Sequence, residues 1–238
     1  LAGQDLGDES EWPCFNGPGR HNRSGETGLL AQWPEGGPPL AWVARGLGAG
    51  YSSVAVVDGV CFTMGNKGES EAIIALDAGT GEKIWSTPIA AASRPSQGHG
   101  PRSTPAVSAG AVYSMGARGD LACLDAATGE IRWQKHILDE FKGADLGWGI
   151  CESVLLDEGR LICTPGGSEA TLVALDPETG DMIWKSLVNG GDRPAYTSPA
   201  WAEVDGIRQY VQIAESGTFG VRADDGQLLW QDYSISGA

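Results

Sequence analysis

The segment ALDAGTGEKIW at residues 75–85 decides the fold, because the chain repeats it at a nearly fixed spacing. The second copy is CLDAATGEIRW at 123–133, the third is ALDPETGDMIW at 174–184, and a more divergent fourth is GVRADDGQLLW at 220–230. The final tryptophans are Trp85, Trp133, Trp184 and Trp230, which lie 46 to 51 residues apart. A period in this range indicates a repeat architecture, so the rest of the chain is interpreted in units of this length.

Each copy predicts a β-hairpin. In the first three copies, apolar residues lead into an Asp-x-x-Thr-Gly turn, where Asp accepts hydrogen bonds from the backbone and glycine supplies a positive φ. A second hairpin lies upstream of each copy, with turns at Asp58-Gly59, Ala109-Gly110, Glu158-Gly159 and Asp205-Gly206. Four strands in about 45 residues form one blade of a β-propeller. The sequence therefore predicts an all-β propeller of four-stranded antiparallel blades.

Four blades are predicted, at about 51–89, 104–137, 148–188 and 196–234, within a repeat region that spans 40–238. Residues 1–39 are rich in glycine, proline and polar side chains, which predicts an extended N-terminal arm across the propeller face. The first ten residues of this arm are expected to be loose. Four blades form a partial ring or an open arc, so we expect a fragment of a longer protein or one half of a ring.

The tryptophans are predicted to hold neighbouring blades together. Four residues before each tryptophan there is a glycine, and ten residues before it there is a small residue. An indole ring can lie flat where there is little or no side chain, so we expect each ring to pack on a neighbouring repeat. The predicted docking residues are Trp85, Trp133, Trp184 and Trp230 with Gly81, Gly129, Gly180 and Gly226.

The spacing Ala-x-Asp-x-x-x-Gly-x-x-x-Trp resembles the tryptophan-docking motif of the PQQ-binding-like, or quinoprotein-type, β-propeller repeat family. The likeness covers about residues 42–230. This family includes quinoprotein dehydrogenases and non-catalytic propellers such as the lipoprotein of the outer-membrane barrel-assembly machine. The resemblance implies a bacterial protein of the periplasm or a secreted one, and it implies PQQ as a cofactor by likeness alone. For catalytic members it also implies a vicinal cysteine pair, a calcium held by acidic and amide side chains, and a catalytic Asp.

The residues of this chain do not supply that catalytic set. The five cysteines are neither adjacent nor spaced as Cys-x-x-Cys, and the three histidines have no carboxylate or cysteine at metal-ligand spacing. Most aspartates fall in turns, where they have a structural role. The sequence therefore predicts no catalytic residue and no metal site.

Charge and hydropathy exclude other classes of function. The net charge is −15, which argues against a nucleic-acid partner and against binding to anionic membranes. The simplest interpretation of this charge is a solvated acidic surface. The sequence contains no apolar run long enough to span a membrane, so no membrane insertion is predicted.

Candidate binding residues lie where the chain enters the innermost strand of each blade, because loops on a rigid scaffold carry function. The four lead-in triplets are Tyr51-Ser52-Ser53, Arg102-Ser103-Thr104, Cys151-Glu152-Ser153 and Tyr196-Thr197-Ser198. The third position is always Ser or Thr, which indicates a structural hydroxyl at the start of the strand. The first two positions differ between blades, and such variation on a repeated scaffold is suited to binding.

Two interpretations of these variable positions stay open. Arg102 and Glu152 are charges near a packed axis, where they would pair with each other or face a wet channel. In the alternative, a ligand or partner pocket at the channel mouth is lined by Tyr51, Ser52, Arg102, Ser103, Trp148, Glu152, Tyr196 and Thr197.

The sequence favours a non-catalytic PQQ-like propeller that acts as a rigid binding or scaffolding platform for a protein or small-molecule partner. The alternative is a quinoprotein-type oxidoreductase with part of the ring missing. A third interpretation is a structural module within a larger multidomain chain.

Overall fold

The computed structural model describes residues 11–145 and 147–234; residues 1–10, which were expected to be loose, lie outside this range. Within the described ranges the chain forms four antiparallel sheets of four strands each. The strands are β1 (Ala55–Val57), β2 (Val60–Lys67), β3 (Ser70–Asp77), β4 (Lys83–Ala91), β5 (Ala106–Ser108), β6 (Ala111–Met115), β7 (Asp120–Asp125), β8 (Ile131–His136), β9 (Leu155–Asp157), β10 (Arg160–Cys163), β11 (Leu172–Leu175), β12 (Met182–Ser186), β13 (Ala200–Val204), β14 (Ile207–Ile213), β15 (Thr218–Arg222) and β16 (Leu228–Asp232). The two short helices are η1 (Pro18–Arg20) and α1 (Ile137–Phe141).

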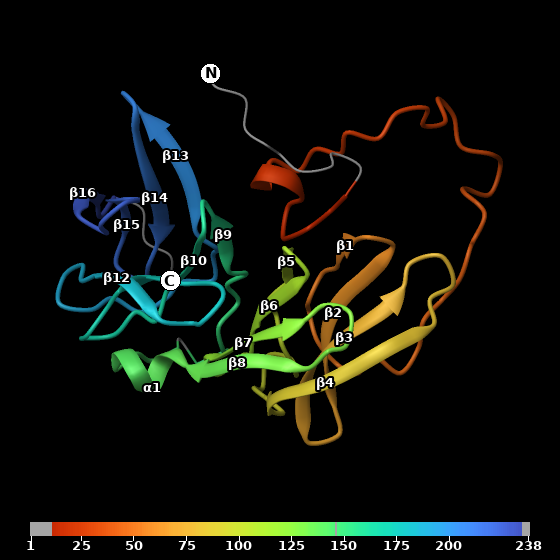
Figure 1. Cartoon of the computed structure of the whole chain (residues 1–238), viewed down its shortest axis with the longest axis horizontal. Helices are drawn as coiled ribbons and strands as arrows, with labels where there is room; N and C mark the ends of the chain where they lie inside the picture. The colour runs from red at the N-terminus through yellow and green to blue at the C-terminus, as the bar shows by residue number, and fades with distance from the viewer. Residues whose placement is uncertain (1–10, 146, 235–238) are drawn as a thin grey trace.

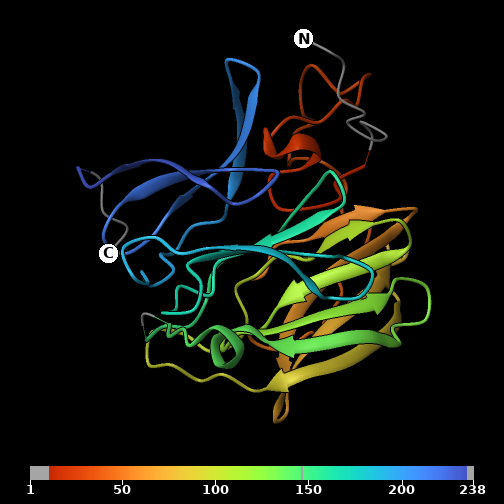
Figure 2. The same cartoon turned by 60° about the vertical axis from the view of Figure 1, so that its left-hand side comes forward.

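The sheets are consecutive meanders that stand side by side in an open arc (Figure 1). We call them sheets 1 to 4, for β1–β4, β5–β8, β9–β12 and β13–β16. The first strand β5 contacts both β1 and β9, so the first strands of sheets 1 to 3 lie side by side nearest the axis. Figure 2 shows the same stacking from the side, with sheet 2 between sheets 1 and 3. The predicted all-β propeller of four-stranded blades is confirmed, and its arrangement is open.

The inner hairpins have the turns that the sequence predicts. Both central residues have positive φ in each of the four turns, for example 50° at Asp58 and 71° at Gly59. This pattern is that of a type I′ turn, whose twist matches that of the paired strands. Ala109 and Glu158 adopt the same left-handed conformation at φ 50° and 44°, although neither is a residue that favours it.

The outer hairpins are closed by their aspartates. Asp77 Oδ1 accepts hydrogen bonds from the backbone N–H groups of Gly79 and Thr80, at 3.0 and 2.8 Å. Asp125 and Asp176 make the same pair of bonds in the second and third sheets. The acidic residues of these turns are therefore used to fix the backbone, as the sequence indicates.

The core is divided among the interfaces between sheets. One cluster of buried side chains joins sheets 1 and 2, a second joins sheets 2 and 3, and a third joins sheets 3 and 4. Phe62, Leu121 and Tyr210 are among the largest side chains that are almost completely buried. Since each interface has its own apolar cluster, every sheet is stabilised chiefly by its neighbours.

The structure places tryptophan rings on the glycines of the following sheet. A Cβ on Gly129 would lie 2.6 Å from the ring of Trp85, and a Cβ on Gly180 would lie 2.9 Å from that of Trp133. Gly226 stands in the same relation to Trp184. The indole N–H of Trp85 also donates to Ala126 O at 3.0 Å, which fixes the ring to the same turn. Each ring thus has a flat glycine surface beneath it and a carbonyl at its edge.

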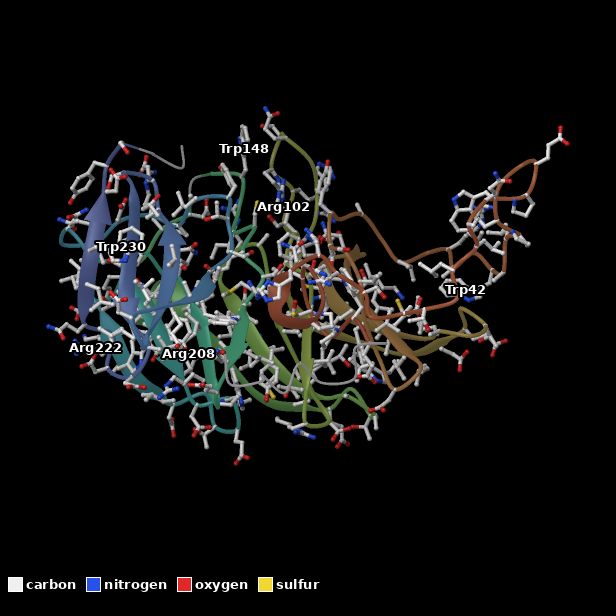
Figure 3. The ribbon with its side chains drawn as sticks, turned by 90° about the horizontal axis from the view of Figure 1, so that it is seen from above. Trp42, Arg102, Trp148, Arg208, Arg222 and Trp230 are labelled. Atoms are coloured by element: carbon white, nitrogen blue, oxygen red, sulfur yellow. The ribbon has the colours of Figure 1, made fainter. Side chains whose placement is uncertain are left out.

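The two ends of the arc differ from this pattern. Gly81 of sheet 1 lies under Trp42, a residue outside any strand, whose indole donates to Ala78 O at 2.9 Å. At the other end Trp230 keeps 39% of its surface exposed, and its indole donates to Gln209 Oε1 within its own sheet. Figure 3 shows Trp42 and Trp230 at opposite ends of the molecule.

Candidate functional site

The third positions of the lead-in triplets form a chain of hydrogen bonds from sheet to sheet. Ser53 N–H donates to Thr104 Oγ1 at 3.3 Å, and Thr104 N–H donates to Ser153 Oγ at 2.9 Å. Ser153 N–H then donates to Ser198 Oγ at 2.9 Å. The repeated hydroxyl was expected to cap the start of its own strand, but it instead accepts from the preceding sheet and links the two. These links also show that Ser53, Thr104, Ser153 and Ser198 occupy equivalent positions in the four triplets.

The second positions bond back to their own sheet. Ser52 Oγ accepts from Met64 N–H at 3.2 Å, and Ser103 Oγ accepts from Met115 N–H at 3.4 Å. Glu152 Oε1 accepts from Thr164 N–H at 3.0 Å, and Thr197 Oγ1 donates to Ile213 O at 3.0 Å. All four side chains therefore tie the innermost strand to the end of the next one. This position is structural, and Glu152 occupies it in sheet 3.

Glu152 is completely buried between sheets 3 and 4. Its second carboxylate oxygen accepts from Gln212 Nε2 at 3.0 Å. Burial raises the pKa of Glu152 to about 7, although the hydrogen bonds from Thr164 and the charge of Arg20 act in the opposite direction. The expectation that Arg102 and Glu152 pair with each other is wrong: Arg102 donates to Gly100 O and Gly98 O at 2.9 and 3.1 Å, and Glu152 bonds to Thr164 and Gln212.

Three of the first positions, together with Trp148, form two pairs. The guanidinium carbon of Arg102 lies 5.2 Å from the centre of the Tyr51 ring, within the range of a cation–π contact. The rings of Trp148 and Tyr196 stack at 5.3 Å with an angle of 17° between their planes. Tyr51 and Trp148 are 63% and 49% exposed. We call Tyr51, Arg102, Trp148 and Tyr196 the channel mouth.

Figure 3 shows Arg102 and Trp148 on the same side of the molecule, with Arg208 and Arg222 on the other. The loop that carries Arg102 needs a glycine at Gly98, because a Cβ there would lie 2.2 Å from the Tyr51 hydroxyl. The loop that carries Arg102 is therefore closely fitted to Tyr51.

The mouth brings together four of the eight predicted binding residues. Ser103 and Glu152 are fully buried, so we leave them out of the candidate site together with Ser52 and Thr197.

Electrostatic interactions connect the two pairs. Burial raises the pKa of the Cys151 thiol, and the guanidinium of Arg102 opposes that rise. Burial likewise raises the pKa of Tyr196, which also interacts with Cys151 and Arg102. Cys151 therefore lies near the mouth, although the sequence indicated it only as the first residue of a variable triplet. Its position in that triplet, equivalent to Tyr51 and Arg102, was the available signal.

A cavity of about 1000 Å³ lies away from the mouth. It is lined by the turns at Asp58 and Glu158, by Phe62 and Trp201, and by Arg20 of the N-terminal arm. The arginines at its edge have partners, since Arg208 bonds to Asp157 and lies 4.1 Å from the Trp201 ring. None of the four mouth residues lines this cavity, so the two features are separate.

The described residues do not fit the metal-dependent quinone site that the resemblance implies. Within 11–145 and 147–234 no group of three or more histidine, cysteine, aspartate or glutamate side chains could hold a metal ion. All five cysteines are free thiols, and none is adjacent to another. No reaction step is therefore derived through such a group. In the same part of the chain, no helix is both long and apolar enough to cross a membrane.

Comparison with known proteins decides the family. The family model described as outer membrane protein assembly factor BamB matches residues 42–237. The chain belongs to this family. The predicted membership of the PQQ-like propeller family is thereby confirmed, and the match begins at Trp42, the ring that lies on Gly81. No curated protein matches the sequence significantly.

Solved structures show the same fold at low identity. Quinohemoprotein alcohol dehydrogenase ADHIIG from Pseudomonas putida HK5 has a TM-score of 0.70 and 20% identity, over 100% of this chain and 42% of its own. The quinohemoprotein alcohol dehydrogenase from Comamonas testosteroni has a TM-score of 0.66 and 18% identity, over 98% and 42%. BamB from Moraxella catarrhalis has a TM-score of 0.50 and 16% identity, over 79% and 64%. The chain spans less than half the length of either dehydrogenase.

Proposed function

We propose that this chain is a non-catalytic binding platform whose site is the channel mouth. The supporting observation is that Tyr51, Arg102, Trp148 and Tyr196 are held in two ring-containing pairs at the surface. The folding contacts of the triplets are made by the second and third positions. Tyr51 and Trp148 of these pairs are exposed to solvent, where a partner can contact them, and the sheets beneath form a rigid support.

The chemistry of the mouth favours a partner with an acidic group next to an aromatic or apolar part. Within the described ranges, no carboxylate lies at ion-pair distance from Arg102, whose bonds are to the carbonyls of Gly98 and Gly100. A guanidinium that is bonded only to uncharged carbonyls keeps its full positive charge and attracts an anionic acceptor. Tyr51 and Trp148 present exposed ring surface beside it. A small aromatic carboxylate or an acidic segment of another protein has this chemistry.

The proposal is tested by titrating the protein with a panel of aromatic carboxylates, observed by ligand NMR. Arg102→Ala should weaken binding by about tenfold or more, because a hydrogen bond to a charged group contributes about 1.5–3 kcal/mol. Arg118→Ala is the matched control, since Arg118 is exposed and already paired with Asp145 at 2.8 Å. Equal binding by wild type, Arg102→Ala and Arg118→Ala would contradict the proposal.

The alternative is a quinoprotein-type oxidoreductase, which rests on the family resemblance. Its test is to add PQQ and calcium to the purified protein and to record quinone absorbance and dye reduction. Dye reduction that requires both additions would replace the platform proposal with the enzymatic one.

We also propose a location in the bacterial cell envelope or outside the cell. The support is the family's description as an outer membrane protein assembly factor. A net charge of −15 is unfavourable for a nucleic-acid partner, which leaves proteins and small molecules as the proposed partner classes. Fractionation of cells that express the full gene, with a periplasmic marker as control, measures the location directly.

A further inference from the structure

The N-terminal segment 12–20 crosses the inner edges of all four sheets. Figure 1 shows it above the inner strands, between β13 and β1. Trp12 exchanges backbone hydrogen bonds with Val56 in β1, at 2.9 and 2.8 Å. Pro13 O accepts from Val107 N–H in β5 at 2.8 Å. The beginning of the segment is therefore bonded to sheets 1 and 2.

The end of the segment is bonded to sheets 3 and 4 through one side chain. Arg20 Nη2 donates to Ser153 O at 2.9 Å and to Val154 O, immediately before β9. Its Nη1 donates to Pro199 O at 2.8 Å, immediately before β13. A guanidinium presents its donors in a rigid planar fork, so one arginine can bridge carbonyls of two sheets.

The segment has an unfavourable backbone conformation at two positions. Gly17 has φ +73°, and a Cβ there would lie 2.6 Å from the Trp12 ring. Arg20 itself has φ +59°, a left-handed conformation that is unfavourable for a residue with a side chain. Arg20 is also largely buried, which lowers its pKa, and no carboxylate of the described chain lies at ion-pair distance from it. The carbonyl bonds to both sheets offset these unfavourable contributions.

The bonded carbonyls lie at the end of the triplets of sheets 3 and 4 or directly after them. Ser153 follows Cys151 by two residues, and Pro199 follows Tyr196 by three. One pair of the mouth comes from the lead-ins to sheets 1 and 2, and the other pair comes from those to sheets 3 and 4. The segment that contains Trp12 and Arg20 is bonded to both halves. It therefore spans the junction between the two halves that carry the two pairs.

We infer that Arg20 is a positioning residue for the channel mouth, and that segment 12–20 is a clasp that fixes the pair Trp148–Tyr196 relative to the pair Tyr51–Arg102. The inference rests on the proposed function, because it assigns the clasp to that same site. If Arg20 only stabilised the fold, its loss would destabilise all four sheets to the same extent. If Arg20 positions the mouth, its loss acts first on the lead-in triplets of sheets 3 and 4.

The test compares the accessibility of two cysteines. Cys151 lies in the triplet that Arg20 supports, whereas Cys123 is buried in β7 and is not bonded to the clasp. Iodoacetamide alkylation of both thiols is followed by peptide mass spectrometry in wild type, Arg20→Ala, Arg20→Lys and Arg23→Ala. Arg23 is an exposed arginine of the same arm and serves as the matched control. Far-UV circular dichroism and urea titration verify that each variant is folded.

Arg20→Ala should raise the alkylation rate of Cys151 relative to Cys123 by about tenfold, because local opening of the triplet becomes easier. Arg20→Lys keeps the charge but cannot bridge both sheets, so it should show a smaller rise in the same ratio. Arg23→Ala should match wild type. If Arg20→Ala does not fold, Arg20→Lys decides. If a folded Arg20 variant has the same ratio of Cys151 to Cys123 alkylation rates as wild type, the inference is overturned.

The outcome is separable from that of the proposed function, since the alkylation ratio is measured without a ligand. If the ratio rises as expected but no aromatic carboxylate binds wild type, the clasp stands and the binding proposal fails. If aromatic carboxylates bind and the ratio is unchanged, the binding proposal stands and the clasp fails.

Discussion

The ring of Trp85 in sheet 1 lies directly against Gly129 of sheet 2, so closely that a Cβ on the glycine would be 2.6 Å from the indole. The same indole donates to the carbonyl of Ala126, three residues before that glycine. One tryptophan therefore contacts the turn of the next sheet both through its face and through its edge. The relationship is repeated between sheets 2 and 3 and between sheets 3 and 4.

Gly129→Ala should therefore be more destabilising than a glycine substitution with the same backbone strain. Gly110→Ala is the matched control, because Gly110 has φ +69° and nothing within 4 Å of its Cβ position. We expect Gly129→Ala to cost about 1–3 kcal/mol more in the free energy of unfolding, since it forces the ring of Trp85 away. Urea titration of both variants measures the difference, and equal costs would show that the ring moves without penalty.

Trp184→Ala should cost about 3–5 kcal/mol, because it empties a buried aromatic site between sheets 3 and 4. Trp184 is 7% exposed and Trp230 is 39% exposed, although the two occupy equivalent positions in their sheets. Trp230→Ala removes less buried area and should cost clearly less. Denaturant titrations that gave the same loss for both substitutions would mean that the contact with the next sheet contributes nothing.

The stability of the protein should fall between about pH 4.5 and 7 because of Glu152. Burial raises its pKa to about 7 from an ordinary value of 4.5, so the folded state binds the proton more tightly than the unfolded state. This contribution is complete below the ordinary value and is lost as the pH rises through the folded value. The loss is on the order of 3 kcal/mol.

Glu152→Gln should flatten this dependence, because the neutral amide does not titrate. Urea unfolding of wild type and Glu152→Gln at several pH values across this range measures the two slopes. Other carboxyl groups contribute equally to both proteins, so the difference reports Glu152. Parallel slopes would mean that the carboxyl does not change its ionisation in this range.

Ser153→Ala should cost about 1–3 kcal/mol, because it removes the acceptor of the buried Thr104 N–H and leaves that donor unpaired. Ser108→Ala in the neighbouring β5 is the control, since its side chain is exposed and the change should stay within about 0.5 kcal/mol. Thermal unfolding of the two variants provides the comparison. A Ser153→Ala variant as stable as Ser108→Ala would indicate that water replaces the hydroxyl.

The sheets could be predicted from the sequence because each depends on local signals. The turn dipeptides, such as Asp58-Gly59, set the hairpins, and the repeated Asp-x-x-Thr-Gly runs set the outer turns. Trp42 was not predicted as a docking residue, because no Asp-x-x-Thr-Gly motif precedes it; the strand expected near residues 40–44 does not form. Its distance from Trp85, close to one repeat, was the signal that could have identified it.

The candidate site was predicted only in part, because the first two positions of the lead-in triplets both vary in the sequence and differ only in what their side chains contact. In the sequence, a glutamate at this variable position suggests a functional role. In the structure, the Glu152 carboxylate accepts a backbone hydrogen bond from its own sheet, as the Ser103 hydroxyl does in sheet 2. Arg20 could not be assigned, since its partners are carbonyls 133 to 179 residues away. Backbone carbonyls carry no residue-specific signal in a sequence.

The three positions of each triplet have different roles, and this affects which substitutions such a protein can accept. Two of every three positions hold the scaffold together, whereas Tyr51, Arg102, Cys151 and Tyr196 are held in place by the scaffold. Exchanging these four side chains would change the surface that the mouth presents while leaving the hydroxyl links intact. With the binding role proposed above, new specificity would be accessible by a handful of substitutions that start from an already folded support, which makes this rim a natural place for library design.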